Sequence, residues 1–169
     1  MIKIGKNISE FSAYSCQPKT KDKLKDIIRD RIKEQGTECD LNDIDVSLIT
    51  DMSYLFYRMN FKGDISNWNV SNVKNMSRMF IDSTFNGDIS KWDVRNVENM
   101  SSTFNNSCLN GDISNWDVRN VNDMCAMFYD SSFDKDISNW KINRKCNTLY
   151  MFDLCLIEKE YKPKALQSC

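Results

Sequence analysis

The sequence predicts an α/β solenoid, in which the chain winds through repeated units of strand and helix that stack on one another. The motif Gly-Asp-Ile-Ser-x-Trp-(Asp/Asn)-Val starts at Gly63, Gly87 and Gly111, and a diverged copy starts at Lys135. The copies are spaced 24 residues apart, with no insertion or deletion between them. Apolar residues recur at the same places in every copy, which is typical of repeat proteins whose units share one core.

Two apolar columns are the clearest of these, and we expect both in the core. They consist of Ile65, Ile89, Ile113, Ile137, Trp68, Trp92, Trp116 and Trp140. Trp68 and Val70 alternate as on a short strand. Val73, Met76 and Phe80 have the spacing of one face of a short helix. A strand and a helix within 24 residues are too small to fold alone, so stacking must complete the core.

The period of 24 residues lies within the range of leucine-rich repeats. The pattern Ile-x-x-Trp-x-Val-x-x-Val, which starts at Ile65, matches the spacing of their frame. It departs from that frame by placing Trp68 at the second leucine and Val73 at the Asn or Cys position. A fainter copy precedes these, beginning at Asp40. We therefore predict a short right-handed, leucine-rich-repeat-like solenoid of about five units, α/β in class.

The sequences that flank the repeats indicate that the chain has three parts. Thr20 is a suitable N-cap for an amphipathic helix, and Gly36 can end that helix. We expect this helix to be an N-terminal cap on the open end of the solenoid, because solenoid ends need a polar cover. The predicted division is an N-terminal segment with the capping helix at 1–39, the repeats at 40–157, and a polar tail at 158–169.

Composition argues against several classes of function. The chain has 23 basic and 24 acidic residues, so its net charge of −1 gives no basis for binding nucleic acid. No apolar run is long enough to span a membrane, so we expect no membrane insertion. Histidine is absent and no Cys-x-x-Cys occurs, so we expect no metal site of the zinc type. We also expect no catalytic residue and no cofactor, and the odd number of cysteines, 7, favours free thiols.

Two columns of acidic and amide side chains allow two interpretations. The first column is Asp64, Asp88, Asp112 and Asp136, and the second is Asp45, Asn69, Asp93 and Asp117. Stacked carboxylates could hold a hard cation such as calcium. Alternatively, each side chain accepts a hydrogen bond from the turn amides beside it. We favour the turn, because known calcium-binding repeats are shorter and richer in glycine. A ladder of identical acids is also a poor acid–base pair, since nothing separates their pKa values.

The positions that differ between neighbouring copies suggest a binding surface beside the predicted strand. The candidate partner-binding residues are Asn67, Lys91, Asn115, Asp93, Asp117, Arg95 and Arg119. Arginines stacked beside aspartates would form a mixed-charge stripe suited to a protein partner. The sequence therefore predicts a protein-binding scaffold for adhesion or host interaction. Two alternatives stay open: an intracellular effector that occupies a host protein, and a repeat protein that assembles with itself.

The complete repeat, F-x-G-D-I-S-x-W-[DN]-V-x-N-V-x-N-M-x-x-M-F, resembles the BspA-like family of leucine-rich-repeat surface proteins. Similar units occur in variable lipoproteins of mycoplasmas, and the resemblance covers roughly residues 17–157. It implies a solenoid used for adhesion or protein–protein contact, with no catalytic residues to carry over. It also implies the cell surface, whereas the free cysteines favour a reducing compartment and no signal peptide is visible, so the compartment stays open.

Overall fold

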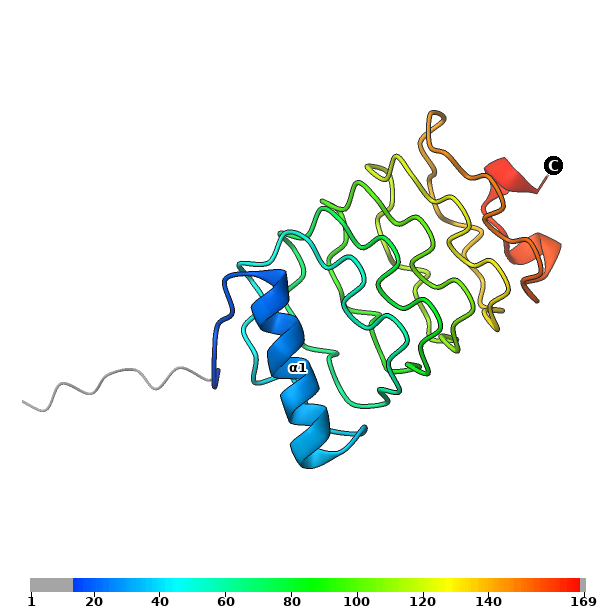
Figure 1. The fold of residues 1–169 in the computed structure, drawn as a ribbon. Helices are drawn as coiled ribbons and strands as arrows, with labels where there is room; N and C mark the ends of the chain where they lie inside the picture. The colour runs from blue at the N-terminus through cyan, green and yellow to red at the C-terminus, as the bar shows by residue number, and fades with distance from the viewer. Residues whose placement is uncertain (1–13, 168–169) are drawn as a thin grey trace, which may run out of the picture.

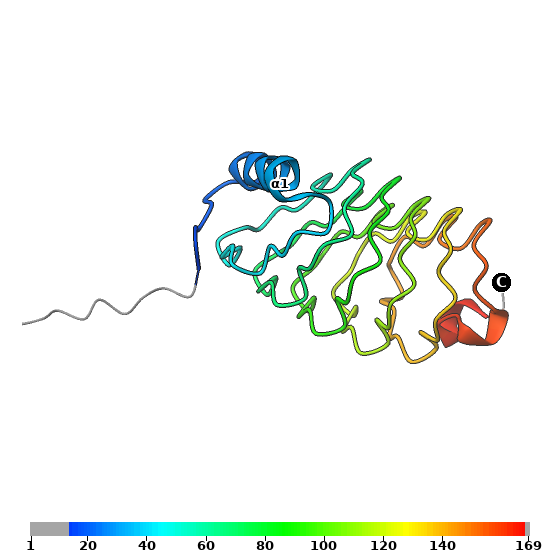
Figure 2. The same ribbon diagram turned by 90° about the horizontal axis from the view of Figure 1, so that it is seen from below.

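The structure is a computed structural model, and it describes residues 14–167. This range contains one α-helix, α1 (Lys21–Gln35), and two short 3-10 helices, η1 (Lys159–Tyr161) and η2 (Lys164–Leu166). Between them the chain winds through successive 24-residue turns, here called coils, which lie side by side along one axis (Figure 1). Seen from below, α1 lies beside the first coil, and η1 and η2 lie beside the last (Figure 2).

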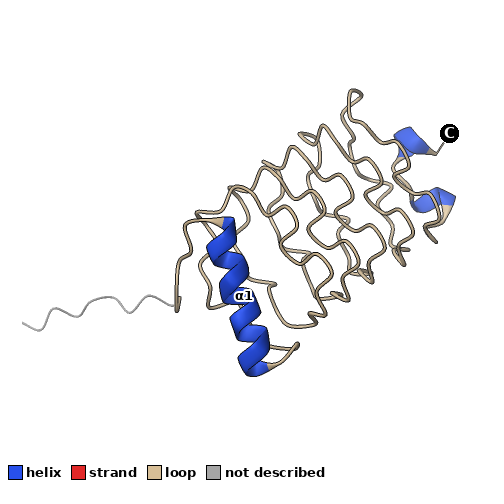
Figure 3. Ribbon diagram, viewed as in Figure 1, coloured by secondary structure: helices blue, strands red, loops and turns tan. Residues whose placement is uncertain are grey.

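The predicted α/β class and its leucine-rich-repeat-like solenoid with a helical cap are wrong. Residues 14–167 contain no β-sheet, and no helix lies within the repeats (Figure 3). The coils are joined instead by isolated parallel bridges that are one residue wide. Most of these bridges connect one column of equivalent positions: Asp51, Asn75, Asn99, Asp123 and Asn147. The repeats are therefore built from turns, which the apolar spacing alone does not distinguish from a strand and a helix.

The three-residue spacing of apolar side chains marks turns rather than a helix face. Trp68 N donates to Ile65 O at 3.2 Å, and Val73 N donates to Val70 O at 2.9 Å. A hydrogen bond from residue i+3 back to residue i closes a β-turn. Each Ile-x-x-Trp and Val-x-x-Val pair thus forms the two ends of a turn. Both ends face the core, because all four of these side chains are buried.

A ladder of hydrogen bonds joins the coils along the segment predicted to be helical. We call its parts ladder segments, and they are residues 52–58, 76–82, 100–106, 124–130 and 148–154. Every second amide of the first four donates to the following coil, as Phe104 N does to Met127 O at 2.9 Å. Intervening amides close turns within their own segment, as Thr103 N does to Met100 O at 3.2 Å. A helix would direct all of these amides along its own axis and leave the coils unjoined.

Left-handed backbone recurs in the ladder. Two residues of each ladder segment, four positions apart, have a φ between 47° and 58°. They are Tyr54, Arg58, Arg78, Asp82, Ser102, Asn106, Ala126, Asp130, Tyr150 and Leu154. This conformation costs roughly 1–2 kcal/mol for a residue other than glycine. The same two positions adopt this conformation in every ladder segment, so it is a regular feature of the ladder. The hydrogen bonds between coils offset its cost in free energy.

The tryptophan column ties each coil to the preceding one from inside. Each indole is 4% exposed, and the isoleucine column beside it is also buried. Trp92 Nε1 donates to Ile65 O at 3.1 Å, and Trp116 Nε1 donates to Ile89 O at the same distance. The same bond recurs at Trp68 and Trp140. Each indole therefore fills space in the core and also satisfies a carbonyl of the neighbouring coil.

The helix predicted between Thr20 and Gly36 is present as α1, although the α/β solenoid that it was expected to cap is not. Thr20 Oγ1 accepts a hydrogen bond from Lys23 N at 3.3 Å, and Gly36 ends the helix with a φ of 91° that favours glycine. Leu24 and Ile28 are fully buried and belong to the same apolar core as the repeats. The helix is therefore held to the coils by its apolar face.

The C-terminal segment, expected to be a polar tail, packs against the last coil. Ile137 N donates to Tyr161 O at 2.9 Å, and Pro163 is buried. Lys162 Nζ lies 5.3 Å from the centre of the Phe152 ring. These contacts hold η1 and η2 beside the end of the repeats.

We predict that Trp92→Ala lowers the free energy of unfolding by about 3–5 kcal/mol, because it empties a buried site between two coils. Trp92→Phe should cost less, roughly 1–3 kcal/mol, because it keeps an aromatic ring but leaves the Ile65 carbonyl without its donor. Urea denaturation measures both. Lys91→Ala is the exposed control and should change stability by less than about 0.5 kcal/mol. A loss below about 1 kcal/mol for Trp92→Ala would contradict the packing described here.

Candidate functional site

The acidic columns lie at turns, and their carboxylates bind backbone amides. Asp88 Oδ1 accepts a hydrogen bond from Ser90 N at 2.9 Å. The same bond, from the amide two residues later, recurs at Asp64, Asp112 and Asp136. It also recurs through the second column, at Asp45, Asn69, Asp93 and Asp117. These are Asx turns, in which a short side chain replaces a backbone acceptor.

The electrostatics of these turns follow from the same bonds. The hydroxyl and amide of Ser90 hold the pKa of Asp88 below its ordinary value, because both donate to the ionised carboxylate. Among residues 14–167, no group of three His, Cys, Asp or Glu side chains is placed to hold a metal ion. The hydrogen bonds to turn amides give the columns a structural role in the turns.

Four of the predicted binding residues form two ion pairs, one in each of two neighbouring coils. Arg95 Nε lies 2.8 Å from Asp93 Oδ1, and Arg119 Nη2 lies 2.6 Å from Asp117 Oδ2. Each arginine is thus paired with the aspartate two positions before it, inside its own coil. The Arg119 guanidinium lowers the pKa of Asp117 to about 2, so this carboxylate is ionised throughout the physiological range.

A groove of about 260 Å³ runs beside these ion pairs. The residues that line it are Ser90, Lys91, Trp92, Asp93, Val94, Arg95, Asn115 and Asp117. Most of the predicted binding residues therefore meet at one place. Asn67 and Arg119 do not line the groove. Asn67 N donates to Asn42 Oδ1 at 2.8 Å in an earlier coil, and Arg119 is connected to the groove through Asp117.

Asparagine side chains fix the backbone that carries this face. Asn120 Nδ2 donates to Arg95 O at 2.7 Å, and Asn96 Nδ2 donates to Ser71 O at 2.8 Å. The turn that presents one arginine is thus held by the next coil. The mixed-charge face, as we call Lys91, Asp93, Arg95, Asn115, Asp117 and Arg119, therefore rests on a fixed backbone while its charged tips are exposed.

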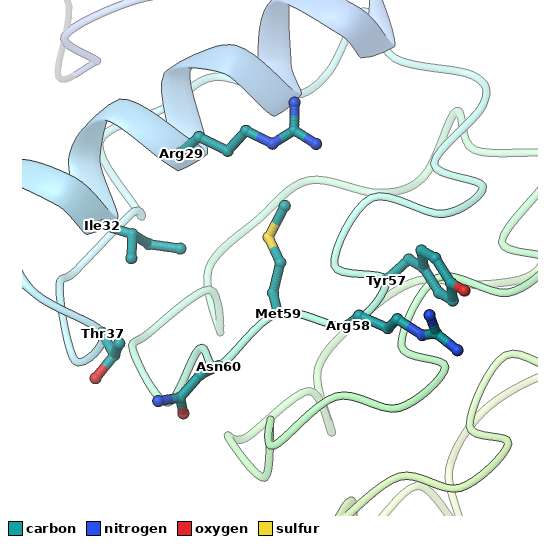
Figure 4. Close-up of a pocket in the computed structure, with 7 residues that line it drawn as sticks. All are labelled: Arg29, Ile32, Thr37, Tyr57, Arg58, Met59 and Asn60. Carbon is teal, nitrogen blue, oxygen red and sulfur yellow. The ribbon is translucent and has the colours of Figure 1, made fainter.

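A second cleft, of about 420 Å³, lies between α1 and the first ladder segment, and sequence analysis missed it (Figure 4). Its lining consists of Arg29, Ile32, Thr37, Tyr57, Arg58, Met59 and Asn60. Arg58 is already engaged, because its Nε lies 3.0 Å from Asp82 Oδ2 and its guanidinium lies over the Tyr57 ring. The lining comes from a helix and from a coil, so no single spacing pattern in the sequence could have joined these residues.

The six cysteines between residues 14 and 167 are free. Burial raises the pKa of the Cys146 thiol to about 11, so little nucleophilic thiolate forms there at neutral pH. No helix in the described part of the chain has the length and apolar character needed to cross a membrane.

We predict that Asp88→Asn changes the free energy of unfolding by less than about 0.5 kcal/mol, because the amide oxygen still accepts from Ser90 N. Asp88→Ala should lower it by about 0.5–2 kcal/mol, as the loss of a similar side-chain acceptor does at a helix N-cap. Thermal unfolding with and without millimolar Ca²⁺ measures both effects. A calcium-dependent rise in Tm that Asp88→Asn abolishes would contradict the turn and favour a cation site.

Comparison with known proteins places the sequence in a family. The sequence matches the family described as "Mycoplasma protein of unknown function, DUF285" over residues 26–130 and 85–157. Neither a curated protein nor a solved structure matches the chain. The two matched segments overlap and together run from within α1 through the last ladder segment. Because they cover well over half of the 169 residues, the chain belongs to the DUF285 family of mycoplasma proteins.

Proposed function

We propose that this chain is a non-catalytic protein-binding scaffold, and that its mixed-charge face contacts the protein partner. One observation carries the proposal: five of the residues predicted from the sequence to bind a partner line a single groove, and they are Lys91, Asp93, Arg95, Asn115 and Asp117. Arginine is enriched at protein interfaces, where its guanidinium binds carboxylates with two parallel hydrogen bonds.

The ion pairs on this face are suited to exchange for contacts with a partner. The side chains of Arg95 and Arg119 are 66% and 69% exposed, respectively. Exposed ion pairs contribute only about 0–1 kcal/mol to stability, so replacing them costs the fold little. A partner with its own surface carboxylates could therefore bind the arginines. Its lysines or backbone amides could bind Asp93 and Asp117.

The backbone beneath the face supports this role. Trp92 and Trp116 lie buried under it, and the Asn120 side chain holds the Arg95 carbonyl. A binding surface that is already ordered loses less conformational entropy on association. The resemblance of the repeat to BspA-like surface proteins further supports this role and suggests adhesion to a host protein as its form.

We predict that the double variant Arg95→Glu, Arg119→Glu abolishes capture of a protein partner, because it replaces both cations with charges that repel partner carboxylates. The measurement is a pull-down with mass spectrometry, using host-cell extract and surface fractions. Lys74→Glu is the matched control, since it reverses a cation that pairs with Glu98 outside the groove.

Proteins bound by the native chain and by Lys74→Glu, but lost with the double variant, would support the mixed-charge face as the binding site. Circular dichroism should show the same fold for all three chains. A partner bound equally well by the double variant would contradict the assignment of this face.

A further inference from the structure

The two ends of the stack leave opposite backbone groups without a hydrogen-bond partner among residues 14–167. In every ladder segment but the last, alternate amides donate to carbonyls of the following coil. The corresponding amides of the last segment belong to Thr148, Tyr150, Phe152 and Leu154, and none of them makes a hydrogen bond within residues 14–167. We call these four amides the donor row. Unpaired backbone groups at an edge are a template for pairing with another chain.

Exposed apolar side chains gather at the donor row. Leu149 and Tyr150 are each 55% exposed, and Leu154 and Leu156 are 67% and 75% exposed. A groove of about 260 Å³ lies along this segment. Its lining includes Thr148, Tyr150 and Phe152 from the donor row, with Lys162 and Leu166 from the C-terminal segment. This end of the molecule thus combines unpaired hydrogen-bond donors with exposed apolar surface, two features of an unoccupied protein–protein interface.

The first ladder segment presents the complementary carbonyls. The amides of the first segment donate to the carbonyls of Asn75, which directly precedes the second segment, and of Ser77, Met79 and Ile81 within it. The equivalent carbonyls one coil earlier, here called the acceptor row, belong to Asp51, Ser53, Leu55 and Tyr57, and none accepts a hydrogen bond among the described residues. The donor row and the acceptor row therefore have the register that joins every pair of neighbouring coils within the chain.

The helix α1 lies beside the acceptor row. Lys21 Nζ contacts Asp51 Oδ2 at 2.7 Å and Ser53 Oγ at 2.8 Å. Lys25 Nζ donates to Tyr54 O at 2.8 Å. Leu24 and Ile28, the buried residues of α1, pack into the same apolar cluster as the first coil. While α1 occupies this position, no second chain can reach the acceptor row.

We propose that the donor row is a docking site for the ladder edge of a second copy of this chain, which binds through its own acceptor row once α1 has moved aside. The contact is confined to the two ladder edges, because the C-terminal segment lies beside another part of the last coil, where Tyr161 O accepts from Ile137 N. Head-to-tail docking repeats, along the ladder edges, the hydrogen bonds that already join neighbouring ladder segments. Tail-to-tail docking would instead bring donors against donors. A head-to-tail contact joins two different surfaces, so each added copy leaves a new donor row and the assembly grows into a filament. The inference is independent of the mixed-charge face.

The test compares the full-length native chain with an opened variant, Leu24→Gln, Ile28→Gln. This variant keeps good helix-forming residues but removes the apolar contact that holds α1. Light scattering after size exclusion, over a wide concentration range, gives the mass in solution. We expect the native chain to stay at 19.8 kDa and the opened variant to grow several-fold with concentration.

Thr148→Pro, added to the opened variant, distinguishes docking from non-specific aggregation. Proline removes one amide of the donor row and places its ring where a carbonyl would approach. The substitution suits the fold, because Thr148 N has no partner within the described residues and Asn147 lies in a parallel bridge. It should weaken association at least tenfold, whereas Thr148→Ala, which keeps the amide, should not.

A second opened variant, Lys21→Ala, Lys25→Ala, keeps the proposal testable if the first opened variant fails to fold. It keeps the apolar contact and removes only the polar ones, so we expect weaker growth that Thr148→Pro also suppresses. Folded opened variants that stay monomeric, or growth that Thr148→Pro leaves unchanged, would overturn the proposal.

Discussion

The structure depends on how each coil divides its backbone amides between two sets of acceptors. Within a ladder segment, alternate amides close turns in the same coil or donate to the next coil. A buried amide without an acceptor is costly, so this division requires the following coil to present its carbonyls in a fixed register. A single inserted or deleted residue would misalign a whole row of bonds. This constraint explains why the copies keep a strict spacing of 24 residues.

The same constraint assigns structural roles to side chains that resemble functional candidates. The aspartates of both columns satisfy turn amides, the tryptophans satisfy carbonyls of the preceding coil, and the asparagines hold the turns of their neighbours. Side chains outside these roles can vary from one coil to the next without cost to the fold. Lys91 and Arg95 are of this kind, as is Arg119, and for this reason the proposed binding role is placed on them. The constraint also leaves unpaired backbone groups at both ends of the stack, and the proposed docking of a second copy rests on these groups.

The sequence was sufficient to locate the period and the ends of α1, because these follow from the recurrence of apolar side chains and from capping residues. It was insufficient to predict the secondary structure of a coil. A spacing of three residues, as between Ile65 and Trp68, occurs on a helix face and equally between the two ends of a turn. The choice between them depends on hydrogen bonds to another coil, which no local pattern contains. For the same reason the cleft between α1 and Met59 could not be predicted.

Amide hydrogen exchange, followed by NMR, tests the division of amides most directly. Ser102 N and Phe104 N donate to the following coil at 2.8 and 2.9 Å, whereas the equivalent amides of Tyr150 and Phe152 have no acceptor in residues 14–167. The account predicts slow exchange at Ser102 and Phe104 and fast exchange at Tyr150 and Phe152, although all four occupy equivalent positions. Equal protection at both sets, as a helix in each repeat would give, or fast exchange at Ser102 and Phe104, would contradict it.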